Sequence, residues 1–136
     1  MKLLLERHND KLAFVTTNES GLTTITDASE KVGGENLGFR PMELLATSLA
    51  SCASIDILLI LEKQRQKLDD FKVEVLGRRG DEIPSKFEEI ELKFHFYGEI
   101  DQKKAENSVK LTLDKYCSVA AMIENNSTLK HSVKIN

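Results

Sequence analysis

The chain has 136 residues, of which 19 are basic and 22 are acidic, so its formal net charge is −3. This length suits one ordinary domain, and we expect a single domain over residues 1–136. A slightly acidic chain without a run of Lys and Arg lacks the electrostatic footprint of a nucleic-acid-binding protein. With 40% hydrophobic residues, seven Gly and two Pro, the composition also excludes an intrinsically disordered chain.

Three short segments rich in β-forming residues open the chain, at residues 2–7, 11–17 and 22–26. Turn-forming residues separate them, and this pattern predicts an antiparallel meander. Residues 27–40 contain three glycines and show no periodicity, which predicts a long loop. A loop of this length in a compact domain is often functional.

The strongest helix signal begins at Pro41, because proline suits the first helical turn, and it continues to Leu61. Apolar residues occur on all sides of this segment, which predicts a buried central helix. The window 44–61 approaches the length of a membrane span. Because Asp56 and four hydroxyl side chains interrupt it, we expect a core helix and no membrane insertion. The first residues contain too short an apolar run for a secretion signal, so we expect a cytoplasmic protein.

The second half of the chain alternates between apolar and charged residues in two segments, 71–75 and 89–96, which predicts two half-buried strands. Asp101 is the expected N-cap of a following helix. A shorter helix is expected from Cys117 to Glu124, and a last strand over residues 129–135. In the helix that Asp101 caps, the side chains expected to point inward are Ala105, Val109, Leu113 and Tyr116. Strands, a long helix, strands, two helices and a strand together predict an α+β domain.

No metal or cofactor motif is present. Neither Cys52 nor Cys117 has a second Cys or a His at ligand spacing, and no phosphate-binding glycine motif occurs. We therefore expect no metal and no cofactor. His131 falls on the apolar face of the last strand, where a core histidine with a satisfied ring nitrogen is the simplest interpretation.

The two cysteines are the remaining candidates for chemistry, and a thiolate needs positive charge nearby. Cys52 lies too far inside its helix for the helix dipole to help, and Asp56, one turn later, disfavours the thiolate. Arg40, in the loop that enters the helix, is the nearest candidate cation. Cys117 lies at the expected start of a helix, where the dipole favours a thiolate. Either cysteine is thus a candidate nucleophile, and an inert buried thiol is the alternative for each.

Two segments resemble motifs of the OsmC/Ohr family of osmotically inducible and organic hydroperoxide resistance proteins. Residues 38–52, GFRPMELLATSLASC, resemble its helix-opening motif, and residues 115–119, KYCSV, resemble its second cysteine motif. The resemblance implies an OsmC-like fold and an intertwined homodimer, with the long helices packed centrally and the active sites at the subunit interface. It also implies that Cys52 is the peroxidatic and Cys117 the resolving cysteine, with a small-molecule hydroperoxide as substrate and an external dithiol as reductant.

The chain departs from the well-studied peroxidases of that family directly after the motif proline. Those enzymes have a glutamate there that orients an activating arginine, whereas this chain has Met42, a form that resembles a less-characterised branch. Glu43 follows, where we expect it to stabilise the helix N-terminus. The family's arginine comes from the N-terminal β-region, which here offers only Arg7, so Arg40 is the candidate thiolate-stabilising residue.

Glu43 and Asp56 are candidate supporting residues. The resemblance thus implies thiol-dependent reduction of organic hydroperoxides in oxidative stress defence. The alternative is a non-enzymatic OsmC-like protein that binds a small apolar or electrophilic ligand at the dimer interface.

Overall fold

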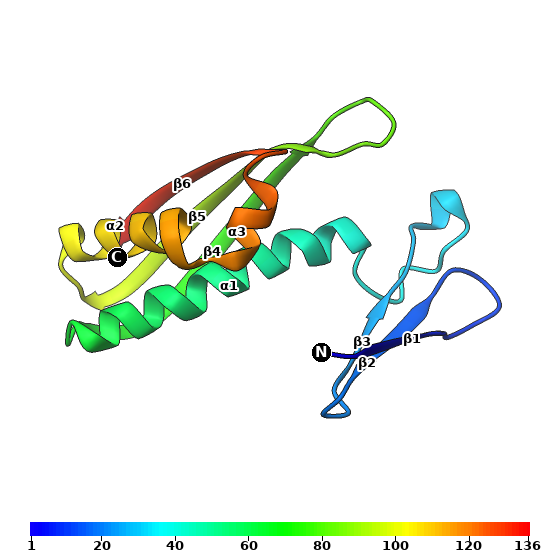
Figure 1. The fold of residues 1–136 in the computed structure, drawn as a ribbon, viewed down its shortest axis with the longest axis horizontal. Helices are drawn as coiled ribbons and strands as arrows, with labels where there is room; N and C mark the ends of the chain where they lie inside the picture. Colours follow the sequence, from blue (N-terminus) through cyan, green and yellow to red (C-terminus); the bar gives the residue numbers. More distant parts are fainter. The chain divides into compact units, whose positions relative to one another are not determined.

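The computed structural model describes residues 1–136, which form two compact units, Met1–Leu45 and Ala46–Asn136. Each unit contains one three-stranded sheet, and helices accompany the second sheet (Figure 1). The predicted α+β class is therefore confirmed. The expectation of one domain over residues 1–136 stays a prediction.

Unit 1 contains the predicted antiparallel meander, formed by β1 (Leu3–Arg7), β2 (Phe14–Asn18) and β3 (Thr23–Thr26) in that order. β2 begins at Phe14, later than predicted, because the residues before it form a turn. The Asn9 side-chain oxygen accepts hydrogen bonds from the backbone N–H groups of Lys11, at 3.0 Å, and Ala13, at 3.2 Å. A side chain that bonds nearby backbone groups in this way competes with strand pairing.

The long helix α1 (Pro41–Lys63) begins in unit 1 and has its greater part in unit 2. Its start is stabilised by Glu43, whose carboxylate accepts a hydrogen bond from the Arg40 backbone N–H at 2.8 Å. This is the reciprocal contact of a capping box, and Pro41 occupies the first helical position. The predicted helix and the expected stabilising role of Glu43 at its N-terminus agree with this geometry.

The sheet of unit 2 consists of β4 (Lys67–Arg79), β5 (Phe87–Glu99) and β6 (Thr128–Ile135). β4 and β5 pair antiparallel, and β5 and β6 pair parallel. The two predicted strands at 71–75 and 89–96 lie within β4 and β5. Both extend further than predicted, and charged side chains pair across their ends, as in the 3.1 Å contact between Lys67 and Glu99. The alternating apolar residues of β5, Ile90, Leu92, Phe94 and Phe96, are buried, as expected.

The C-terminal helices are α2 (Gln102–Leu111) and α3 (Ser118–Ile123), joined by the π-helical turn η2 (Thr112–Tyr116). They lie on the same side of the sheet as α1 (Figure 1). Asp101 is the N-cap of α2, as predicted, and its carboxylate accepts from the Lys104 backbone N–H at 2.9 Å. The buried stripe contains Ala105 and Val109, also as predicted.

Two burial predictions are wrong. Tyr116 was expected to point inward but is 57% exposed, because the π-turn rotates the chain and the next residue, Cys117, takes the buried position. His131 was expected to be a core histidine, but its side chain is exposed and borders a surface hollow. The strand alternation placed His131 on the face of β6 that carries the half-buried Leu129 and Val133, but the His131 side chain borders the hollow there.

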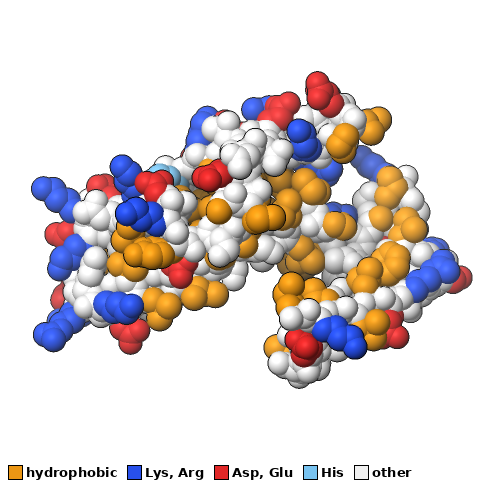
Figure 2. All heavy atoms as spheres, viewed as in Figure 1, with side chains coloured by type: hydrophobic (Ala, Val, Ile, Leu, Met, Phe, Trp, Pro, Cys, Tyr) orange, Lys and Arg blue, Asp and Glu red, His pale blue; other side chains and the backbone are white.

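Helix α1 buries part of its surface within the chain, and its other apolar side chains, including Ile55, Leu58 and Leu59, are exposed. Figure 2 shows such side chains on the surface over α1. By length and composition alone, this helix is also long and apolar enough to cross a membrane. The predicted burial on all sides is therefore not reached within one copy of the chain.

Candidate functional site

Cys52 lies in the middle of α1 and is half-buried. The helix is unbroken here, since the sequence from Pro41 to Lys63 contains no glycine and no second proline. Asp56 follows one turn later on the same side and is also half-buried. The position of Cys52 gives its sulfur partial access to solvent.

Cys117 lies between the π-turn η2 and α3, and only 3% of its surface is exposed. Its backbone N–H donates to the carbonyl oxygen of Thr112 at 2.8 Å, which closes the wide turn. Its sulfur is the N-cap of α3 and accepts a hydrogen bond from the Ala120 backbone N–H at 3.4 Å. The same sulfur lies 4.0 Å from the carbonyl oxygen of Leu49, in the turn of α1 that leads to Cys52.

The structure brings the two thiols together. Burial, with a hydrogen bond and electrostatic repulsion from Cys52, raises the pKa of the Cys117 thiol to about 11, although the backbone N–H groups of Ala120 and Val119 act in the opposite direction. The expectation that the helix start lowers this pKa is therefore wrong, because burial outweighs it. At neutral pH Cys117 holds its proton, and Cys52 is the less buried of the two cysteines.

Arg40 lies in unit 1, at the end of a loop that a buried carboxylate organises. Its guanidinium donates to the carbonyl oxygen of Gly38 at 3.0 Å and to the side-chain oxygen of Asn36. These contacts turn the cation back toward the residues that precede it in the loop. The role of Arg40 at the Cys52 thiol stays a prediction.

Asp27 is the buried carboxylate of this loop, with 3% of its surface exposed. It accepts hydrogen bonds from the backbone N–H groups of Ala28 at 2.7 Å, Glu35 at 3.0 Å and Leu37 at 3.2 Å. Burial alone would raise the pKa of Asp27, but these hydrogen bonds and the charge of Arg40 outweigh it and lower that pKa. The sequence analysis missed Asp27, although an acidic residue at the start of a glycine-containing loop is a known signal for a loop organiser.

Arg7, the arginine of the N-terminal strands, has a structural role. Its guanidinium donates to the carbonyl oxygen of Lys11 at 3.1 Å and to that of Asp10, and so holds the turn between β1 and β2. These contacts account for Arg7 without any role at a thiol.

A hollow of about 400 Å³ lies in unit 2, and two of the residues that border it are close to the cysteines in the sequence. Asp56, one turn after Cys52, and Tyr116, directly before Cys117, both border it. Its wall is mostly apolar and includes Leu59, Ile60 and Leu111, with Lys63 and Gln64 at the rim. This hollow could not be predicted from the sequence, because its two sides come from distant segments.

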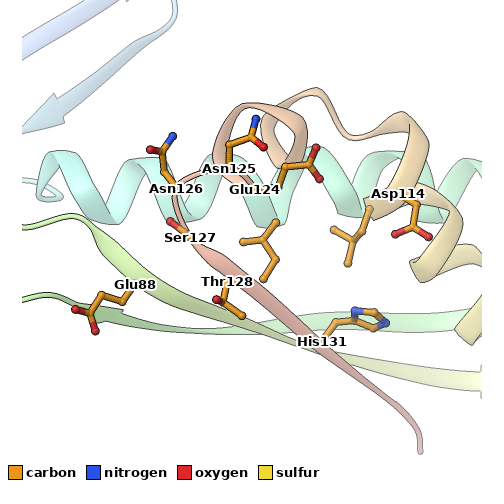
Figure 3. A pocket seen from close by; sticks show the side chains of 10 residues that line it. Glu88, Asp114, Glu124, Asn125, Asn126, Ser127, Thr128 and His131 are labelled. Carbon is orange, nitrogen blue, oxygen red and sulfur yellow. The ribbon is translucent and has the colours of Figure 1, made fainter.

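A larger hollow of about 510 Å³ lies between the end of α3 and β6, and neither cysteine borders it. Figure 3 shows Glu124, Asn125 and Asn126 on the chain that leaves α3, with Thr128 and His131 on β6. Three carboxylates, those of Glu88, Asp114 and Glu124, border this hollow, and no Lys or Arg does. Nowhere do three or more His, Cys, Asp or Glu side chains converge as a metal site requires.

Comparison with known proteins identifies relatives of this chain. A family model described as OsmC-like protein matches residues 33–132. Protein YhfA of Escherichia coli is 34% identical over 96 residues, which are 70% of this chain and 72% of YhfA. The crystal structure of a hypothetical protein from Aquifex aeolicus is 35% identical, covers 99% of this chain and 95% of its own, and has a TM-score of 0.87.

A more distant similarity extends to a peroxide-resistance protein. The organic hydroperoxide resistance protein OhrB of Bacillus subtilis has a TM-score of 0.70 over 98% of this chain and 96% of its own, at 17% identity. At this identity the similarity shows the shared fold alone. The predicted OsmC-like fold is confirmed by these matches.

Proposed function

Because the chain belongs to the OsmC-like protein family, whose members include organic hydroperoxide resistance proteins, we propose that it reduces organic hydroperoxides with Cys52 and Cys117. One observation carries the proposal: two sulfurs 65 positions apart in the sequence meet, one half-exposed and one buried. Such a pair supplies both a nucleophile and an internal partner to resolve its oxidised form. Family membership itself indicates a role in the response to peroxide or related stress.

The first step takes place at Cys52. Its thiolate attacks the terminal oxygen of the hydroperoxide, the O–O bond breaks, and the alkoxide leaves and takes up a proton to become an alcohol. Cys52 is then a sulfenic acid. The half-exposed position of Cys52 suits this role, since the attacked oxygen must reach the sulfur.

The second step takes place between the two cysteines. The Cys117 sulfur attacks the sulfur of the Cys52 sulfenic acid, the S–O bond breaks, and water leaves as the disulfide forms. An external dithiol then reduces this disulfide and becomes oxidised itself. Burial of Cys117 keeps peroxide away from its sulfur, and its pKa of about 11 keeps it protonated at neutral pH, so Cys52 reacts first.

The apolar hollow bordered by Asp56 and Tyr116, which are close to the cysteines in the sequence, supports an organic substrate. Leu59, Ile60 and Leu111 provide a surface for an alkyl or aryl group, and Tyr116, the residue before Cys117, also borders the hollow. Hydrogen peroxide has no group that would gain from such a surface. We place the activity in the cytoplasm, where dithiol reductants are available.

We further propose that the protein works as a homodimer. Ile55 is 59% exposed on α1, and Leu58 and Leu59 beside it are also exposed. An apolar helix face of this kind needs a partner, and a second copy of the same chain provides an equally apolar face.

We assign the thiolate-stabilising role to Arg40, and supporting roles to Glu43 and Asp56. Glu43 fixes the helix start that follows Arg40, through its bond to the Arg40 backbone N–H. Asp56 lies one turn after Cys52 and borders the apolar hollow, where it limits the position of a bound substrate.

One observation favours a second candidate function, a non-enzymatic protein that binds a small apolar or electrophilic ligand. The Arg40 guanidinium donates to Gly38 and Asn36 in its own loop, and a guanidinium that keeps these contacts is not a cation committed to Cys52. Without such a cation the Cys52 thiolate forms less readily, and the hollow would then serve binding alone.

The decisive experiment is consumption of tert-butyl hydroperoxide with dithiothreitol as reductant. Wild type should turn over and pass through an intramolecular disulfide, detected by mass as a loss of two hydrogens. Cys52→Ser should abolish turnover, Cys117→Ser should allow oxidation of Cys52 without the disulfide, and the exposed neighbour Ser51→Ala should behave as wild type. Equal, slow consumption by wild type and Cys52→Ser would refute the enzyme and favour the ligand-binding protein.

A further inference from the structure

The reduced cysteine pair has a second chemical property besides its redox chemistry. We propose that Cys52 and Cys117 together bind one soft monovalent cation of the Cu(I) class, held by two sulfur atoms. This inference goes beyond the proposed peroxidase and does not depend on it, since it needs only two reduced thiols that face each other.

The geometry provides two sulfur donors from separate helical elements. Cys52 projects from α1, and Cys117 lies where η2 meets α3, with its sulfur 4.0 Å from the Leu49 carbonyl oxygen on α1. Leu49 lies three residues before Cys52 on α1, so the 4.0 Å contact places the Cys117 sulfur at the turn that leads to Cys52, and the hydrogen-bond contact between the two thiols agrees with this. A cation between them would therefore be held by side chains whose backbones are already fixed.

The donor set selects the kind of ion. Zn²⁺ takes four ligands in structural sites and three protein ligands in catalytic ones, whereas no third His, Cys, Asp or Glu joins this pair. Mg²⁺ and Ca²⁺ require several oxygen ligands. Thiolates are soft ligands that favour Cu(I), and a site with sulfur alone offers nothing to harder ions.

The binding reaction balances in bonds, protons and electrons. Two S–H bonds break, two Cu–S bonds form, two protons leave to solvent, and no electron is transferred. One cation with two thiolates carries a net charge of −1, and the Ala120 and Val119 backbone N–H groups already hydrogen bond to the Cys117 sulfur. These donors stabilise the negative charge on the buried side, and Cys52 provides the access from solvent.

The test is a competition titration, without oxygen, between the reduced full-length protein and bicinchoninate, a coloured Cu(I) chelator. Wild type should withdraw one Cu(I) per chain. Cys52→Ser and Cys117→Ser should each weaken binding by at least about 100-fold, since loss of a mere outer partner of a ligand costs about 10- to 100-fold. Met122→Leu, which removes an exposed thioether, should bind as wild type does.

Two further measurements keep the test independent of how the variants fold. Wild type alkylated at Cys52 with N-ethylmaleimide should lose Cu(I) binding, and X-ray absorption of the Cu(I) complex should show two sulfur neighbours. Wild-type affinity in both serine variants or in the alkylated protein, or Zn²⁺ binding as tight as Cu(I) binding, would overturn the inference. A protein that binds Cu(I) but consumes no peroxide would refute only the peroxidase, and an active peroxidase that does not bind Cu(I) would refute only this site.

Discussion

The backbone N–H of Cys117 donates a hydrogen bond to the carbonyl oxygen of Thr112, five residues earlier, at 2.8 Å. An α-helix would instead pair residues four apart and would place Tyr116 on the buried face below Thr112. The extra residue of the π-turn moves Tyr116 to the surface and puts Cys117 in the buried position beside α1. A single widened turn therefore decides which side chain meets Cys52, and π-turns are frequent at functional sites for such reasons.

This relationship predicts opposite effects for a deletion and an insertion in the turn. Removing the exposed Lys115 would place Cys117 four residues after Thr112, so the cysteine stays on the buried face and the disulfide still forms. Inserting one alanine after Lys115 would rotate Cys117 by about 100° and slow disulfide formation. The measurement is the rate of disulfide formation after addition of peroxide, with Lys115→Ala as the control. Equal rates in the deletion and insertion variants would contradict this explanation.

The raised pKa of Cys117 predicts a loss of stability at alkaline pH. The unfolded thiol loses its proton near pH 9, whereas the folded one holds it until about pH 11. The folded state therefore binds more protons in this window, and the free energy of unfolding falls as pH rises, by at most about 1.4 kcal/mol per pH unit. Urea unfolding of reduced protein between pH 8 and 11 measures this slope, and Cys117→Ser should reduce it. A slope in Cys117→Ser equal to that of wild type would show that another group is responsible.

Arg40→Ala tests the assigned cation. If Arg40 stabilises the Cys52 thiolate, the variant should react more slowly with iodoacetamide at neutral pH, and its pH–rate profile should shift to higher pH. Arg40→Lys should retain part of the effect, because it keeps the charge. Lys103→Ala removes an exposed charge from α2 and provides the control. An unchanged profile in Arg40→Ala would remove Arg40 from the mechanism.

Asp27→Asn should loosen the loop at residues 27–40. The pKa of Asp27 is lowered, so its stabilising effect is present above its usual value of 3.8 and is lost as pH falls through the lower, folded-state pKa. At pH 7 the variant should show reduced hydrogen-exchange protection at the Leu37 amide, and the difference from wild type should shrink in acid. The exposed Asp10→Asn is the matched control, and equal loss of protection in both variants would argue against a specific role for Asp27.

Ile55→Glu tests the homodimer. A charge on the exposed apolar face of α1 should shift the protein to a monomer, because burying an unpaired carboxylate in an interface is costly. Light scattering after size-exclusion chromatography measures the mass, and Glu62→Gln, near the polar end of the same helix, is the control. A wild type that is monomeric at all concentrations would contradict the proposed dimer directly.

Much of the fold could be predicted from periodicity and capping. Pro41 and the apolar run after it predicted α1, the alternation from Ile90 to Phe96 predicted β5, and Asp101 predicted the start of α2. These features depend on neighbouring residues, so a short stretch of sequence contains their cause.

The details of the site depend on contacts between distant residues and could not be predicted in the same way. The pKa of Cys117 is raised by burial and by Cys52 on α1, a helix that ends more than 50 residues earlier, and these effects outweigh the local effect of the helix start. The contacts of Arg40 depend on a loop that Asp27 closes from ten residues away. His131 was placed on the correct face of β6, but its side chain borders a hollow that segments distant in the sequence form, with Glu88 on one of them and Leu113 on another.

The separation of the two sulfurs along the chain has a consequence for heat resistance. A disulfide between Cys52 and Cys117 would close a ring that encloses β4, β5 and α2. Chain-entropy arguments assign about 4 kcal/mol to a cross-link that restricts an unfolded loop of roughly 65 residues. The disulfide form should therefore melt at a higher temperature than the reduced form. Calorimetry would then report how much of the protein has been oxidised.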